Sequence, residues 1–474
     1  MTEEQEQALQ LATEAGHILL ENGAEISRVE ETMTRIASAY GIEDESFFVL
    51  SNGIIATGQH YARAEFIPIK GTQLAKVVEV NQLSRDVTAG ERGNELSLSV
   101  DKMKSLSDSH HINISTYQRI NISTYQRIND SNEFTNSQVN TFKPMPVETL
   151  RQRIQAIRTM PGKVWWEMVL GIALGVSSFS ILFGGSLVDA MATLVSGVLL
   201  GLFMTFVSPH LSRLMGNVAG GLVGGILCIL LYRLAMGIEG LPQLHLANMI
   251  IGTIIALVPG VPFTNGMRDL ANEDYIAGTT RLTDAFLAFL CIALGVALAF
   301  IIDGVTTGGI IQLGAPVKDS LASHWVIQLV AAFVGTVGFS ALFGAPRRYY
   351  LYCGLAGMAG WAVYLLVAAG HSVVGAAFFA ALTVAAISHV MARLCRCPVT
   401  VFLICGIIPL VPGGGIFWTA YYIVTEQLRM AATMGFVALK VTIAIAGGII
   451  LASGIINKCH LNSLMHKSIN ELKK

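Results

Sequence analysis

The sequence predicts a multi-span α-helical membrane protein, with ten transmembrane helices as two inverted five-helix repeats, preceded by a small cytoplasmic α+β domain. Charge is uneven, since residues 1–163 hold 37 of the 63 Asp, Glu, Lys and Arg residues and residues 164–457 hold only 21. Apolar residues make up 53% of the chain, and the mean hydropathy is +0.58. Such a composition is typical of a soluble segment followed by a membrane segment. Short motifs also recur along the apolar part at nearly equal offsets.

Residues 1–160 are predicted to form the cytoplasmic domain. Apolar residues at helical spacing predict two helices within residues 1–40, the first ending at Asn22-Gly23, where glycine suits a left-handed C-cap. The elements expected next are strands over 46–51, 54–57 and 65–69, with an Asn-Gly hairpin turn at 52–53, and a helix over about 73–88. The acidic N-terminus lacks the order of a signal peptide, so the domain is expected in the cytoplasm.

Residues 90–145 are predicted to be a flexible insert. They are rich in Ser, Asn and Thr, and such a composition buries too little apolar surface to offset the entropy of ordering. The octapeptide NISTYQRI occurs twice in tandem within them, at 113–120 and 121–128. Two copies are too few for a solenoid, so we interpret them as a local duplication.

Ten apolar segments are long enough to cross about 30 Å of hydrocarbon. They lie at about 168–188, 190–207, 214–232, 244–261, 285–302, 325–345, 349–369, 373–392, 398–424 and 433–457. The first five make up a repeat over 164–303 and the last five a repeat over 321–457, followed by a tail over 458–474 that is expected in the cytoplasm.

The distribution of arginine and lysine predicts the orientation of these segments. With the N-terminal domain inside, the inner loops carry seven arginines (Arg213, Arg268, Arg281, Arg347, Arg348, Arg393 and Arg396), and the outer loops carry only Arg233, Lys318 and Arg429. This agrees with the positive-inside rule. We therefore expect a multi-pass protein of the plasma membrane with both termini in the cytoplasm.

Two motifs indicate that the second half repeats the first. FSILFG at 179–184 recurs as FSALFG at 339–344, and LVPG at 257–260 recurs as LVPG at 410–413. The offsets of 160 and 153 residues keep the two motifs in the same order. An odd number of spans in each half makes the second half enter from the opposite face, so the repeats are predicted to be inverted, as in many secondary transporters.

The second motif predicts a break in one helix of each half. Proline removes a backbone donor and glycine loosens the helix, which hydrocarbon tolerates only where protein or water supplies partners. A helix that restarts after the break presents free N–H groups suited to a substrate carboxylate. The substrate site is therefore predicted at Pro259, Gly260, Pro412, Gly413 and Gly414, with ordinary turns between spans as the alternative.

Several ionisable residues are candidates for function. Asp269, beside Arg268, is expected to bind a substrate ammonium group or carry a proton, unless the pair is solvated. Lys440 is expected to contact a carboxylate, pair with an acid, or extend to the headgroups. Hydrated helix caps are expected at Asp189, Asp284 and Asp303. His389, within a span, is expected to have a packing role, with a proton relay as the alternative.

Other classes of protein are disfavoured. A net charge of −1 without a basic stripe argues against a nucleic-acid partner. The sequence has no nucleotide-binding G-x-x-x-x-G-K-[ST] loop and no G-x-S-x-G or H-E-x-x-H motif, so we expect no enzyme activity. The Cys-x-Cys at 395–397 is weak evidence for a metal, and neither a metal nor a cofactor is expected. A passive channel that is gated by a ligand of the N-terminal domain remains an alternative.

Three stretches resemble the threonine/serine exporter family. They are residues 14–33 (EAGHILLENGAEISRVEETM), LVPG at 257–260 with Asn265, Arg268, Asp269 and Leu270, and residues 408–414 (IPLVPGG). The chain is similar to a fused form of longer and shorter components that some bacteria keep separate. The resemblance implies a secondary active transporter that exports small amino acids, threonine and serine, across the plasma membrane. It also implies ion coupling, with a proton as the expected ion, and adds Asn265 to the expected site. Export of dicarboxylates such as succinate is the alternative, and homo-oligomer formation stays open.

Overall fold

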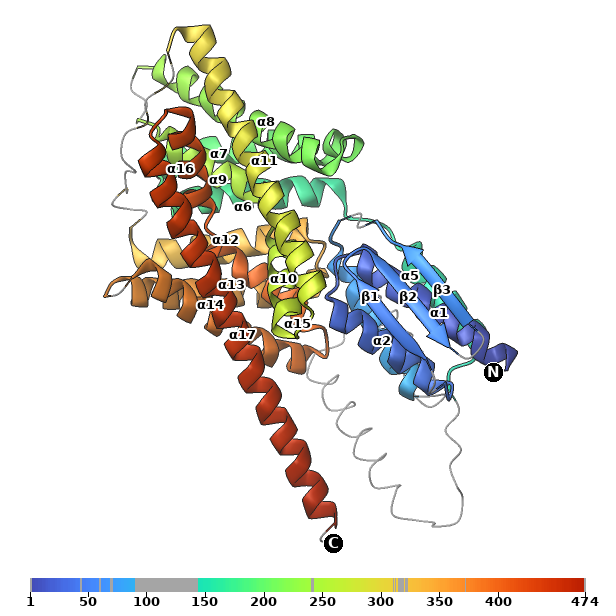
Figure 1. The fold of residues 1–474 in the computed structure, drawn as a ribbon. Helices are drawn as coiled ribbons and strands as arrows, with labels where there is room; N and C mark the ends of the chain where they lie inside the picture. Colours follow the sequence, from blue (N-terminus) through green and yellow to red (C-terminus); the bar gives the residue numbers. More distant parts are fainter. Residues whose placement is uncertain are drawn as a thin grey trace, which may run out of the picture.

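The computed structural model describes residues 2–42, 45–58, 61–68, 71–89, 144–239, 243–309, 311, 313, 319, 323–370 and 372–472. It consists of an N-terminal α+β unit beside a larger bundle of apolar helices (Figure 1). The insert predicted over 90–145 falls almost wholly outside the described residues.

The N-terminal unit is a three-stranded antiparallel sheet covered by helices. Its elements are α1 (Glu3–Glu21), α2 (Ile26–Ala39), β1 (Ser46–Leu50), β2 (Gly53–Gly58), β3 (Tyr61–Phe66), a helix over 74–89 and α5 (Val147–Arg158). Thr2 and Gln5 form a capping box that starts α1, and Gly23 follows it with a φ of +83°. Leu19, Met33 and Ile54 are among the buried side chains that join the helices to the sheet.

Two parts of this unit differ from the sequence prediction. The third strand lies at 61–66 rather than 65–69, because Gly58 pairs directly with Tyr61 and the hairpin leaves only two residues between the strands. Pro68 lacks an N–H group and cannot extend the ladder. The helix α5 was not predicted, and it packs on α1 through buried residues that include Leu150 and Ile154.

Within the described residues, eight helices of the bundle are long and apolar enough to cross a membrane, and two bent helix pairs would raise the number to ten. The helices are α6 (Trp165–Leu182), α7 (Leu187–Phe206), α8 (Arg213–Met236), α9 (Leu246–Ile254), α10 (Gly260–Ala271), α11 (Tyr275–Thr307), α12 (Trp325–Leu342), α13 (Tyr350–Ala368), α14 (Val373–Cys395), α15 (Val399–Ile407), α16 (Gly413–Val424) and α17 (Leu428–Leu472). The prediction of a multi-span helical membrane protein is confirmed. Residues 458–472 continue α17.

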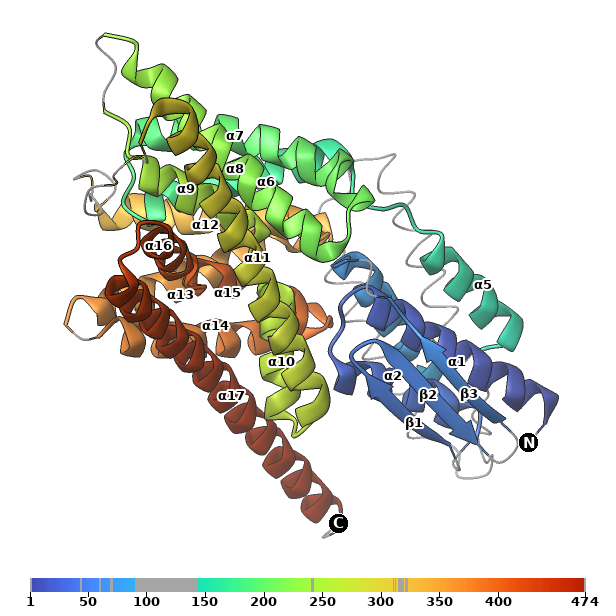
Figure 2. The same cartoon turned by 45° about the horizontal axis from the view of Figure 1, so that its top comes forward.

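The elements of the two halves correspond one to one. Offsets of 160 residues relate the starts of α6 and α12 and of α8 and α14, and offsets of 153 residues relate α9 to α15, α10 to α16 and α11 to α17. Glu273 and Glu426, also 153 residues apart, both take positive φ angles, 66° and 58°, just before the last helix of each half. Figure 2 shows α11 and α17 as the two longest helices of the bundle.

Reciprocal contacts join the two halves where α6 crosses α12. Phe179 of α6 and Phe339 of α12 pack with ring centroids 5.3 Å apart. A Cβ added at Gly175 would lie 2.9 Å from the Phe339 ring, and one at Gly335 would lie 3.1 Å from the Phe179 ring. Phe179 and Phe339 are 160 residues apart, and so are Gly175 and Gly335. Equivalent residues of the two halves therefore make equivalent contacts with each other. The small residues let the helices approach closely, as in many membrane bundles.

The aspartates expected as hydrated caps are in part more deeply placed. Asp189 caps α7 through Ser186, is fully buried, and its carboxylate lies 2.8 Å from the His245 ring. Asp303 is buried and receives two hydrogen bonds from the guanidinium of Arg233, at 2.7 and 2.8 Å. The prediction of hydration was therefore wrong for these two, because polar partners from neighbouring elements take the place of water. Asp284 is about half exposed.

Close crossing of α14 and α17 predicts that alanine at Gly448 is destabilising. A Cβ there would lie 2.5 Å from the backbone oxygen of Phe378, so the helices would have to separate, at a cost of about 1 to 3 kcal/mol. Thermal unfolding of the purified Gly448→Ala protein in detergent should show a lower Tm. Gly454 lies on the same helix with open space around its Cβ position, so Gly454→Ala is the control and should leave Tm unchanged or slightly higher. Equal Tm values for the two variants would contradict the crossing.

Candidate functional site

Each half contains one helix broken by the same backbone geometry. The helix α9 ends in a 3-10 turn over Ile255–Leu257, and α15 ends in one over Ile408–Leu410. Pro259 and Pro412 follow with φ/ψ of −76°/60° and −77°/52°, close to an inverse γ-turn. The N–H groups of Gly260 and Gly413 each donate to the carbonyl two residues earlier, at 2.8 Å. The helices then restart at angles of 60° and 46° to their first segments.

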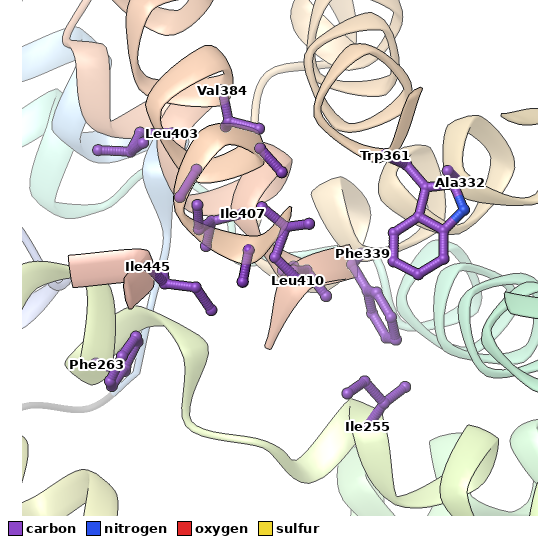
Figure 3. Close-up of a cluster of buried hydrophobic side chains, with 14 of the residues drawn as sticks. Ile255, Phe263, Ala332, Phe339, Trp361, Val384, Leu403, Ile407, Leu410 and Ile445 are labelled. Carbon is purple, nitrogen blue, oxygen red and sulfur yellow. The ribbon is translucent and has the colours of Figure 1, made fainter. Parts of the chain in front are cut away.

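The two breaks face each other in the middle of the bundle. Val258 and Gly260 of one half line the same cavity as Ile408 and Val411 of the other, together with Phe339. This cavity measures only ≈ 10 Å³, which is about the room of one water molecule. Figure 3 shows Ile255, Phe339 and Leu410 side by side at this point. In this conformation the space between the breaks is therefore sealed by apolar side chains.

The restarted helices differ in the donors they offer. In α16 the N–H groups of Gly414 and Gly415 belong to the first turn, which has no partners within its own helix. In α10 the corresponding residues are Val261 and Pro262, and proline has no N–H group to donate. The break at Pro412 is therefore the better position for a carboxylate.

The far end of α10 binds the N-terminal unit. Asn265 Nδ2 donates to the carbonyl of Gly23 at 2.7 Å, and Asp269 accepts from the N–H of Ile26 at 3.4 Å. The other carboxylate oxygen of Asp269 lies 2.8 Å from Arg281 Nη1, and Arg281 Nη2 donates to the carbonyl of Ala24 at 2.9 Å. Asp269 is 1% exposed, and Arg281 is 3% exposed. The loop over residues 22–26 is thus held by a buried ion pair.

Further contacts fix the same interface. Arg268 forms an ion pair with the buried Glu25. The N–H groups of Leu74 and Ala75 donate to the carbonyls of Phe343 and Gly344, just beyond α12, at 3.1 and 2.8 Å. Lys163 donates to the carbonyl of Leu342, and burial lowers the pKa of this lysine to about 8. The N-terminal unit therefore rests on α10, α11 and the end of α12.

The structure separates the predicted site residues into three places. Five of them, Pro259, Gly260, Pro412, Gly413 and Gly414, lie at the two breaks. Asn265, Arg268 and Asp269 lie beyond them on α10, against the N-terminal unit, and Lys440 is exposed on α17. Arg281 and Glu25 belong to the buried cluster but were not singled out from the sequence. The pairing of Glu25 with Arg268 joins residues more than 200 positions apart, whereas Arg281 lies only 12 positions beyond Asp269 and could have been considered as its partner.

The apolar helices and the paired broken helices define a multi-span membrane protein of the transporter class. A family model described as "Putative threonine/serine exporter" matches residues 10–109 and 94–302, and a second model described as "Threonine/Serine exporter, ThrE" matches residues 328–455. The chain belongs to the threonine/serine exporter family, and both of its conserved portions occur in this one chain.

Two relatives match part of the chain. A threonine/serine exporter of Corynebacterium glutamicum is 24% identical over 318 residues, which is 65% of this chain and 63% of the relative. A protein of Mycobacterium tuberculosis named "Probable threonine/serine exporter" is 26% identical over 292 residues, or 59% of this chain and 53% of the relative. The matches thus span between half and two thirds of these relatives. No solved structure matches the chain significantly.

The buried pair predicts that Asp269→Asn loosens the N-terminal unit. Removing one partner leaves Arg281 buried without its counterion, at a cost of about 3 kcal/mol. Hydrogen exchange measured by mass spectrometry should become faster in residues 22–26 of the variant. The matched control is Asp284→Asn, since Asp284 is 4.0 Å from Arg213 and both side chains are about half exposed. Equal exchange in both variants would contradict a role for the pair in docking.

Proposed function

We propose that this protein exports threonine and serine across the plasma membrane as an ion-coupled secondary transporter, with a proton as the coupling ion. The observation that carries the proposal is the meeting of two broken helices, one from each half, in a single sealed space. Paired broken helices are the usual place of substrate binding in secondary transporters. The names of the relatives support hydroxy amino acids as the cargo.

The proposed substrate site lies between the breaks. The N–H groups of Gly414 and Gly415 are placed to receive the substrate carboxylate, beside Pro412 and Gly413 and opposite Pro259 and Gly260. The space of ≈ 10 Å³ is too small for an amino acid, so the halves must move apart to admit one. The described structure corresponds to a closed state of this site.

The remaining candidates have proposed roles outside the closed site. Asn265, Arg268 and Asp269 connect α10 to the N-terminal unit, and we assign them to control of the break at Pro259. When the halves separate, the carboxylate of Asp269 on α10 also becomes able to contact a substrate ammonium group. Lys440, exposed on the surface of α17, suits a contact with lipid headgroups.

The two halves are proposed to be inverted, with the N-terminal unit and both termini in the cytoplasm. The reciprocal packing of Phe179 and Phe339 is what a pseudo-two-fold axis at the crossing of α6 and α12 would produce. Such an axis in the membrane plane follows from five spans in each half, if each bent pair counts as one span.

Flux through proteoliposomes tests the cargo and its coupling. Vesicles loaded with radiolabelled threonine or serine should release label faster when a proton gradient is imposed, and vesicles loaded with succinate should not. Release of succinate in preference to both amino acids would favour the dicarboxylate alternative. Release that follows only the substrate gradient, at rates independent of the proton gradient, would indicate a passive channel.

Alanine substitution of a glycine at one break tests whether the substrate passes between the two breaks. A Cβ at Gly413 would lie 2.8 Å from Ile255 of the other half, whereas a Cβ at Gly260 would meet nothing within 4 Å. Gly413→Ala should lower the transport rate about fivefold at unchanged protein level, the effect of about 1 kcal/mol of crowding on the moving parts. Gly454→Ala on α17 is the control and should transport normally, because its Cβ position is open and Gly454 does not line the space between the breaks. Equal rates would place the passage elsewhere.

Cysteine labelling tests the inversion. Leu187 and Arg347 are exposed, equivalent residues 160 positions apart at the start of the second span in each half. In a protein whose native cysteines have been replaced, Leu187→Cys should react with a membrane-impermeant maleimide from outside and Arg347→Cys only from inside. Labelling of both from one side would exclude inverted repeats.

A further inference from the structure

A cavity of ≈ 340 Å³ lies between the N-terminal unit and the end of α14. Five basic side chains line it: Arg28 of α2, Arg85 of the helix over 74–89, and His389, Arg393 and Arg396 at the end of α14. We call this cavity the arginine cavity. It is separate from the space between the breaks, with which it shares no lining residue.

Few carboxylates balance the charge of the arginine cavity. Arg28 contacts Glu31 at 2.8 Å and Glu25 at 3.6 Å. Each of these glutamates is shared with a second guanidinium, Glu31 with that of Arg35 and Glu25 with that of Arg268. The acids beside Arg28 are thus already divided between two cations.

Two further arginines of the cavity, Arg85 and Arg393, lack acidic partners in the described part of the chain. Arg85 donates to the backbone carbonyl of Arg396 at 3.1 Å, which ties the two units together without neutralising a charge. Neither Arg85 nor Arg393 forms an ion pair with a described residue. Burial and the nearby charges of Arg35 and Arg28 lower the pKa of Arg85. The cavity is therefore a region of unbalanced positive potential.

Structural roles account for only part of this cluster. Arg393 lies in the last turn of α14, where a cation interacts favourably with the helix dipole. This does not explain why Arg28 and Arg85, from a different folding unit, face the same space. Convergent like charges repel one another unless an anion lies between them.

We propose that the arginine cavity binds a phosphate-bearing ligand that bridges the N-terminal unit to α14. Guanidinium groups match phosphate oxygens with two parallel hydrogen bonds, and several arginines suit a group with more than one negative charge. The volume exceeds that of a single phosphate, so it leaves room for the rest of a small phosphorylated molecule.

A phospholipid headgroup offers the same chemistry from a second source. Leu394, between Arg393 and Arg396, is 78% exposed, and Val390 one turn earlier is 57% exposed. Such apolar exposure on a membrane helix indicates contact with lipid close to the cavity. The experiment must therefore separate a soluble phosphate compound from an anionic lipid.

Thermal unfolding of the full-length protein in nanodiscs tests the proposal in two arms. The first arm uses phosphatidylcholine alone and adds pyrophosphate as the soluble probe. The second adds no pyrophosphate and replaces part of the lipid with phosphatidylglycerol. Binding to the folded state should raise Tm in a concentration-dependent manner in one arm or both. The arm that responds identifies the source of the phosphate.

Variants locate the effect. Arg393→Gln and Arg85→Gln should each weaken the response at least about tenfold in probe concentration, as expected for loss of a charged hydrogen bond. Arg393 is exposed, so its replacement should not disturb folding. The control is Arg429→Gln, which removes an equal charge from an exposed position at the start of α17 and should respond like the parent protein. No rise in Tm in either arm, or the same rise in all three variants, would overturn the proposal.

Discussion

A broken helix inside a membrane must find partners for its backbone, and this constraint organises the bundle. Each break satisfies one donor through an inverse γ-turn and others through a 3-10 turn, and proline removes a further donor altogether. The rest of the break is shielded by the equivalent break of the other half. The surrounding spans hold the two breaks next to each other, and glycines at the helix crossings let these spans pack closely.

The helix α10 connects this central point to the N-terminal unit. It is 12 residues long, or about 18 Å, with the break at its first residue and Asp269 near its last. Because this short helix has the turn at one end and a buried ion pair at the other, a displacement of the ion pair would also move the turn. Movement of the N-terminal unit is therefore mechanically connected to the break at Pro259.

Local sequence patterns predicted the spans, the breaks and the repeated motifs, because each depends on residues close in the chain. Gly23 after α1 could also be predicted, since its positive φ favours glycine. The Asn-Gly hairpin turn was predicted one residue too late, because the turn lies at 51–52 and Gly53 already pairs with Leu50 in β2. The partners of Asp269 were not, because Ile26 lies 243 positions away and Arg281 looked like an ordinary loop charge. Asp189 and Asp303 were taken as hydrated for the same reason: their partners belong to other helices.

The N-terminal unit attaches to the end of α12, whereas the equivalent carbonyl of Gly184 beyond α6 accepts a hydrogen bond from the N–H of Asp319. Two halves of similar fold would by themselves give a transporter two conformations of nearly equal free energy, one open to each side of the membrane. A domain that contacts different elements of the two halves removes this degeneracy, because its binding energy counts in one conformation and not equally in the other. Asymmetry of attachment is thus a means of setting which face the resting protein presents.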